Sequence, residues 1–213
     1  MMIFTSIYSV VDGLFVSNFV GKSAFAAVNL IMPFLMGISA LGFMIGTGGS
    51  AIVAKTLGEG KIENANEYFS MLVYITAIGG IIIAILSMFL VKPVAILFGA
   101  NGALLDNCIL YGRILCISLP AFMLQNVFQS FFVTAEKPHL GLRVIVIAGV
   151  TNMVLDFLFV AVLHFGLPGA GFATVCGEFI GGLFPLFYFG RKNSSLLKLG
   201  KTHFHGRILL KTC

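Results

Sequence analysis

Three stretches of the chain run for more than twenty residues without a charged side chain, at residues 24–54, 68–91 and 114–135. Because a helix rises 1.5 Å per residue, about 20 apolar residues are enough to cross the hydrocarbon core of a bilayer. Strands of outer-membrane barrels alternate over about ten residues, whereas these runs are continuous and about twice that length. The three runs therefore predict membrane-spanning helices.

The composition agrees with a membrane location. Of 213 residues, 59% are hydrophobic and 10% are charged, and the mean hydropathy is +1.05. A soluble domain has about 25% charged residues, and intrinsic disorder requires low hydrophobicity. So few charges cannot cover the surface of a soluble domain. We therefore predict an integral membrane protein.

Three further apolar runs are each interrupted by one acidic residue: Asp12, Asp156 and Glu178. Counting them, we expect an all-α polytopic membrane protein with six transmembrane helices. The expected helices cover residues 1–20, 24–53, 68–92, 111–134, 142–163 and 169–189.

The basic residues indicate the orientation in the membrane. With the N-terminus inside, the outer segments hold only Lys22, Lys92 and Arg113. The inner segments hold ten basic residues: Lys55, Lys61, Lys137, Arg143, Arg191, Lys192, Lys198, Lys201, Arg207 and Lys211. The positive-inside rule then predicts a multi-pass protein of the cell membrane (plasma or inner) with a cytoplasmic N-terminus. The net charge of +5 does not indicate nucleic acid, because the basic residues are dispersed between apolar runs.

The acidic residues in the apolar runs lie near one depth. A carboxylate in hydrocarbon costs at least about 2.5 kcal/mol, so each calls for an explanation. Counted from the outer turns, Asp12 and Asp156 are both about 15 Å deep, Thr174 about 12 Å and Glu178 about 18 Å. Half of a core about 30 Å thick is about 15 Å. These side chains are therefore expected to meet near the midplane.

Helical spacing groups these residues further. Asn152 and Asp156 share one side of their helix, and so do Thr174 and Glu178. Carboxylate, amide and hydroxyl oxygens suit a hard cation, and a buried carboxylate pair can instead hold a proton. We predict a cation-coupling site for Na+ or H+, with no catalytic residue, no cofactor and no metal other than Na+.

Structural roles remain open for each of these residues. Asp12 is also suited to cap a helix beginning at Gly13, and Asn152 to join two helices by hydrogen bonding. Thr174 is suited to bond its own helix backbone, and Glu178 to pair locally or to face a second half of a larger protein. Three amides of the fourth helix are expected either to line a polar cavity or to act in packing: Gln125, Asn126 and Gln129.

Two sequence patterns concern helix packing. Gly42, Gly46 and Gly49 form a stripe of small residues, which is typical of helices in close contact. Residues 12–16 (DGLFV) resemble residues 156–160 (DFLFV), and a second similar pair follows at 25–28 and 172–175. An internal repeat, as found in many transporters, and chance matching in a narrow alphabet both account for this similarity.

The order of these segments resembles the first half of a multidrug and toxic compound extrusion (MATE) transporter. The matching segments are residues 11–16, 27–33, 50–61, 113–120, 152–156 and 169–174, and the likeness covers nearly all of residues 1–190. The resemblance implies a twelve-helix antiporter of two six-helix lobes. It also implies that Asp12, Asn152, Asp156 and Thr174 form the cation site of the first lobe, whereas Glu178 has no counterpart in that set.

The chain departs from the family pattern in length. Residues 1–190 are expected to form one lobe with a truncated first helix, and residues 191–213 a basic cytoplasmic linker with the start of the next helix. We interpret the chain as a fragment that lacks the C-terminal lobe, rather than as a half-transporter that dimerises.

The resemblance implies an efflux transporter, not an enzyme, that exports drugs, organic cations or metabolites in exchange for Na+ or H+. Its expected partners are bilayer lipids and a small-molecule substrate, with no nucleic acid. A lipid or lipid-linked oligosaccharide flippase is one alternative, but no Lys or Arg lies deep in a helix, which favours a cationic or neutral substrate. An intramembrane aspartyl protease is a second alternative, with Asp12 and Asp156 as the dyad, although a GxGD motif is missing.

Overall fold

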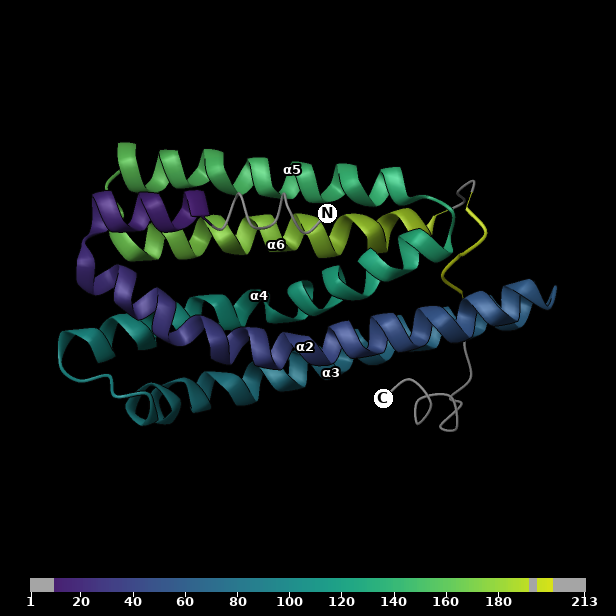
Figure 1. Ribbon diagram of the computed structural model, residues 1–213, viewed down its shortest axis with the longest axis horizontal. Helices are drawn as coiled ribbons and strands as arrows, with labels where there is room; N and C mark the ends of the chain where they lie inside the picture. Colours follow the sequence, from purple (N-terminus) through teal and green to yellow (C-terminus); the bar gives the residue numbers. More distant parts are fainter. Residues whose placement is uncertain (1–9, 192–194, 201–213) are drawn as a thin grey trace.

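The computed structural model describes residues 10–191 and 195–200, and all regular structure in that part of the chain is helical (Figure 1). Helical residues 10–15 lead into a π-helix, η1 (Val16–Val20). The remaining elements are α2 (Lys22–Gly58), α3 (Ile62–Leu97), α4 (Ala103–Thr134), α5 (Pro138–Asp156), the π-helix η2 (Phe157–Val162) and α6 (Gly166–Gly190). In the described residues, five helices are long and apolar enough to cross a membrane, and Val10–Val20 is a shorter apolar helix.

The expected number and order of helices are confirmed, but several predicted ends are wrong. The helix expected at 68–92 covers Ile62–Leu97, and the one expected at 111–134 begins at Ala103. The helix expected at 24–53 continues to Gly58. Hydropathy locates the part of a helix that lies in lipid, whereas the polar ends continue the helix into water. Residues 1–9 of the expected first helix lie outside the described residues.

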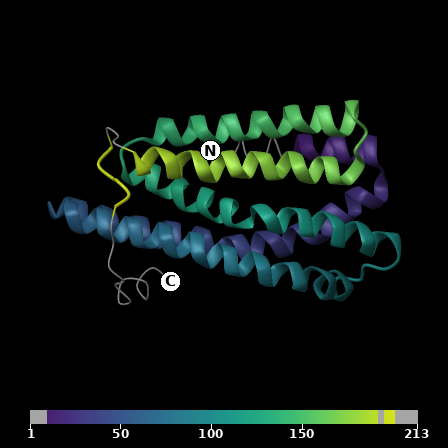
Figure 2. The same cartoon turned by 180° about the vertical axis from the view of Figure 1, so that it is seen from behind.

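Helix α4 lies at the centre of the bundle. Figures 1 and 2 show α2 and α3 on one side of it, with α5, α6 and the N-terminal helix on the other. More than half of its most apolar segment is buried inside the protein, a larger share than in any other spanning helix described. Its central position explains why three amides of α4, Gln125, Asn126 and Gln129, can line a cavity within the bundle.

The glycine stripe of α2 packs against α4, as its spacing predicts. A Cβ atom added at Gly42 would lie 2.8 Å from the carbonyl oxygen of Met123, and one at Gly46 would lie 2.9 Å from Cα of Val127. The two backbones therefore approach more closely than any other residue allows. Gly49 faces Leu72 of α3 instead.

Two separate apolar clusters form the core. One gathers Val16, Ile31 and Val160 with other side chains toward the end that holds the turn at Gly21. The other contains Val144 and a group of aromatic rings that includes Phe69 and Phe189. Along α5 and η2, Asn152 and Asp156 fall between Val144 and Val160, so the polar residues lie between the two clusters.

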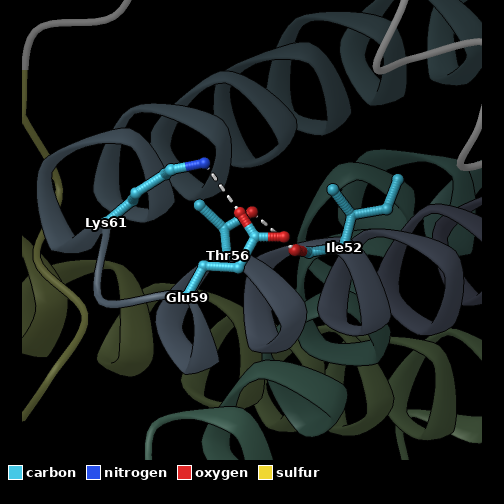
Figure 3. Close-up of polar contacts among 4 residues, drawn as sticks. All are labelled: Ile52, Thr56, Glu59 and Lys61. Carbon is cyan, nitrogen blue, oxygen red and sulfur yellow. Dashed lines mark hydrogen bonds and ion pairs between the residues drawn. The ribbon is translucent and has the colours of Figure 1, made fainter.

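Successive turns lie at alternate ends of the bundle (Figure 1). The α2–α3 turn is a tight link in which Lys61 Nζ contacts Glu59 Oε2 at 2.8 Å and Gly60 has a φ of 78° (Figure 3). The neighbouring Thr56 hydroxyl donates to the carbonyl of Ile52 at 2.9 Å (Figure 3). Lys61 lowers the pKa of Glu59, and Glu59 raises the pKa of Lys61, through this hydrogen bond and their opposite charges.

A short strap, residues 195–200, follows α6 and packs against α3. The amide of Lys198 donates to Asn66 Oδ1 at 2.7 Å, and the amide of Gly200 donates to Ser70 Oγ at 2.9 Å. Leu197 is fully buried in the aromatic cluster. The strap is thus part of the fold at the end of the expected lobe. The rest of the expected linker, residues 192–194 and 201–213, lies outside the described residues.

Candidate functional site

The two predicted aspartates come together in the middle of the bundle. Asp12 is 6% exposed and Asp156 is fully buried, and their carboxylates lie close enough to interact. Next to them, the rings of Phe15 and Phe157 meet edge to face with centroids 6.5 Å apart. Residues 10–15 are already helical, so the alternative in which Asp12 only caps a helix starting at Gly13 is wrong.

Asn152 and Thr174 join the same region from neighbouring helices. The amide of Asn152, which is 3% exposed, donates to the hydroxyl of Thr174 at 3.5 Å. That hydroxyl in turn donates to the carbonyl of Ala170 in its own helix at 3.1 Å. The structural roles considered for both residues are therefore present, and they hold the Thr174 oxygen and the Asn152 side chain in fixed positions.

Several oxygens in this region have no hydrogen-bonding partner among the described residues. They are Asp12 Oδ1, Asn152 Oδ1 and both carboxylate oxygens of Asp156. A buried polar atom without a partner is costly, and an unpaired carboxylate more so. Because all four atoms are acceptors, the arrangement fits a species that supplies positive charge, either a proton or a small hard cation.

Two cavities adjoin these residues. The smaller, of about 20 Å³, is bordered by Asn152, Thr174, Gln125 and Glu178 among apolar groups and has room for one water molecule or a small ion. The larger cavity, of about 160 Å³, is lined by polar side chains on one part of its wall and by apolar side chains on the other. Its polar wall consists of Asp12, Gln125, Asn126, Gln129, Thr174 and Glu178. Its apolar wall consists of Met32, Leu35, Met36, Leu115, Leu119 and Phe122.

The structure thus places all eight predicted residues around the two cavities or the aspartate pair. Gln125, Asn126 and Gln129 line the larger cavity from α4, as expected of cavity residues. Gln125 also packs closely on α6, since a Cβ added at Gly181 would lie 3.1 Å from its Cγ. Asp12 and Thr174 belong both to the aspartate region and to the cavity wall, so the two features are continuous.

Sequence reasoning missed Tyr111. Its side chain is fully buried. Among the described residues, no group lies within hydrogen-bonding distance and angle of its hydroxyl. The phenol is within electrostatic range of Asp12, Asp156 and Glu178 and is near Thr174. A tyrosine at the expected start of a helix is typical of a membrane interface, so only its true position, two turns inside α4, could have identified it.

The profile of the family described as MatE matches residues 1–158. The multidrug export protein MepA of Staphylococcus haemolyticus is 27% identical over 199 residues, which covers 92% of this chain and 44% of MepA. The probable multidrug resistance protein YpnP of Bacillus subtilis is 27% identical over 198 residues, which covers 85% of this chain and 41% of YpnP. The chain therefore spans less than half the length of these relatives.

Solved structures match the fold over almost the whole chain. One described as the outward-facing conformation of a multidrug resistance MATE family transporter of the MOP superfamily has a TM-score of 0.91 at 26% identity. The match covers 99% of this chain and 47% of the transporter chain in that structure. The inward-facing conformation of such a transporter gives a TM-score of 0.90, with 97% of this chain and 47% of that one covered.

Proposed function

The chain belongs to the MatE family, and on this premise we propose that it is the ion-binding lobe of a secondary transporter. It corresponds to the N-terminal lobe of that family, a multi-pass membrane fold. The transporter exports drugs, organic cations or metabolites from the cell in exchange for Na+ or H+. Asp12, Asn152, Asp156 and Thr174 bind the coupling ion, and the adjoining cavity takes the substrate.

One observation carries this proposal. Four acceptor oxygens from Asp12, Asn152 and Asp156 are buried at the middle of a membrane bundle with no donor to satisfy them among the described residues. A structural role alone would leave the bundle with a large unfavourable desolvation term. Binding and release of a cation gives these oxygens a partner that is present only in part of the transport cycle.

Coupling requires the ion to favour one global state over another. A ligand can shift such an equilibrium only through different affinities for the two states. The lobe resembles outward-facing and inward-facing transporters about equally, with TM-scores of 0.91 and 0.90. This similarity supports a cycle in which the lobe moves nearly as a rigid body against a second lobe. The second lobe is supplied either by the rest of a longer chain or by a second copy of this one.

We further propose that the N-terminus is cytoplasmic. Lys55, Lys61 and Lys137 lie at or near the turns at one end of the bundle, whereas Lys22 lies at the other. Reporter fusions test this orientation. Phosphatase should be active when fused in the α3–α4 loop and inactive when fused in the α2–α3 turn.

The decisive experiment for the ion site is an Asp156→Asn variant. In vesicles that contain the complete two-lobed transporter, an imposed Na+ or proton gradient should drive efflux of a fluorescent organic cation by the wild type and not by the variant. Asp106→Asn is the matched control, because Asp106 is exposed near the start of α4 and lines neither of the two cavities. Gradient-driven efflux that persists in Asp156→Asn at normal expression refutes the site assignment.

A further inference from the structure

Glu178 is the third acidic residue that interrupts an apolar run of the sequence, and it is not part of the aspartate pair. It lies on α6 one turn beyond Thr174, about 6 Å further along the helix axis. Glu178 borders both the small cavity next to Asn152 and the larger cavity that contains Asp12. It therefore stands at the boundary between the proposed ion site and the proposed substrate space.

In the part of the chain that the structure describes, no basic side chain (Lys, Arg or His) borders the cavities beside Glu178. The hydroxyl of Ser118 is close enough to act as a hydrogen-bonding neighbour, but it is neutral. Since an ionised carboxylate away from water needs a charged partner or a proton, the partner of Glu178 must come from the cavity.

The wall of the larger cavity indicates what kind of partner fits. Met32, Met36 and Phe122 supply polarisable and aromatic surface, which favours contact with an organic cation. Gln125 and Asn126 supply neutral hydrogen-bonding groups beside it. An anionic ligand would face Glu178 and Asp12 with no compensating charge, and a small inorganic cation would leave the apolar wall unused.

We propose that Glu178 is the charge-recognition residue of the larger cavity and binds the cationic centre of an organic cation separately from the Asp12–Asp156 pair. This inference rests on the proposed function, and it adds that the coupling ion and the substrate cation bind at separate carboxylates. The coupling ion occupies the aspartate pair, and the substrate cation occupies the larger cavity beside Glu178. Neutral molecules that enter the cavity should then bind without any contribution from Glu178.

Equilibrium binding to the purified 213-residue chain in lipid nanodiscs tests the proposal. The probe is radiolabelled tetraphenylphosphonium, with triphenylphosphine oxide as a neutral probe of related shape. Glu178→Gln should weaken tetraphenylphosphonium binding at least about tenfold, the effect of losing one favourable charge interaction, and should leave binding of the neutral probe within about twofold. Asp156→Asn should retain tetraphenylphosphonium binding. Its binding of the neutral probe, to which Glu178 does not contribute, should lose the sensitivity to added Na+ or protons that the wild type shows.

A double variant that moves the carboxylate from position 178 to position 125 controls for loss of folding. Gln125 lines the same two cavities from α4, so Gln125→Glu combined with Glu178→Gln returns one carboxylate to the cavity from a different helix. This double variant should recover most of the lost tetraphenylphosphonium affinity. Recovery would show that charge in the cavity, rather than local structure at position 178, determines binding.

The two proposals fail in different ways. Unchanged tetraphenylphosphonium binding by Glu178→Gln, equal losses for both probes, absence of recovery in the double variant, or no binding by the wild type overturns the role of Glu178. If instead Glu178→Gln behaves as expected but Asp156→Asn keeps full ion sensitivity, the substrate site stands and the proposed coupling site is wrong.

Discussion

Gly42 offers the sharpest test of how the bundle is held together. A methyl group added there would lie 2.8 Å from the Met123 carbonyl oxygen and 2.9 Å from its Cα, where an ordinary contact begins at 3.4 Å. The obstacle is the α4 backbone, which cannot rotate away as a side chain could. Gly42→Ala must therefore separate α2 from α4 by about 0.6 Å, at an overpacking cost of about 1–3 kcal/mol.

The same helix supplies a matched control. Gly37 is exposed and has no atom within 4 Å of a Cβ added to it. Gly37→Ala should therefore gain the helix propensity of alanine, up to about 1 kcal/mol, without any clash. Because both variants gain this propensity term, the difference between them isolates the packing cost. We expect Gly42→Ala to be less stable than Gly37→Ala by about 1–3 kcal/mol.

Unfolding in mixed detergent and dodecyl sulfate micelles measures this difference. The chain has no tryptophan, so far-ultraviolet circular dichroism is the suitable signal. The unfolding midpoint of Gly42→Ala should move to a lower dodecyl sulfate fraction. The midpoint of Gly37→Ala should stay unchanged or move to a higher fraction. Equal midpoints for the two variants would refute the close α2–α4 contact as a source of stability.

Three further substitutions probe the aromatic cluster, the strap and the exposed turn. Phe69→Ala removes a ring whose centroid lies 4.8 Å from that of Phe131, and should cost about 3–5 kcal/mol in the same unfolding titration. Leu197→Ala should release the strap, so limited proteolysis should cleave residues 195–200 faster than in the wild type while the helices persist. Lys61→Ala should raise the lowered pKa of Glu59 toward its usual value, measurable by carbon NMR titration, without a measurable change in stability because the pair is exposed.

The sequence was sufficient to predict the helices but not their ends. The uncharged run at residues 68–91 identifies the lipid-facing part of α3, yet the helix begins at Ile62 and includes Glu63 and Glu67. Charged residues are good helix formers in water, so charge marks the edge of the bilayer rather than the end of the helix. The same reason explains why α4 begins eight residues before its predicted start.

For a related reason, only part of the site could be predicted from the sequence. Depth follows from counting residues, so Asp12 and Asp156 could be placed at one level without a structure. Which side chains face a cavity depends on helix rotation and tilt, which counting does not provide. Tyr111 illustrates the limit, because its position in sequence suggested an interface while tertiary packing buries it beside the aspartates.

The two aspartates meet for a reason that the sequence does not reveal. Each is separated from the turn that follows its helix by a π-helical segment, η1 after Asp12 and η2 directly after Asp156. A π-helix closes its hydrogen bonds five residues apart, as between the amide of Gly21 and the carbonyl of Val16 at 3.1 Å and between Leu163 and Leu158 at 2.9 Å. Counting at 1.5 Å per residue therefore overestimates both depths. Because η1 has five residues and η2 has six, the errors nearly cancel, and the two carboxylates still meet. The similar segments at residues 12–16 and 156–160 thus each lead into a π-helix, which begins one turn after Asp12 in the first and directly after Asp156 in the second.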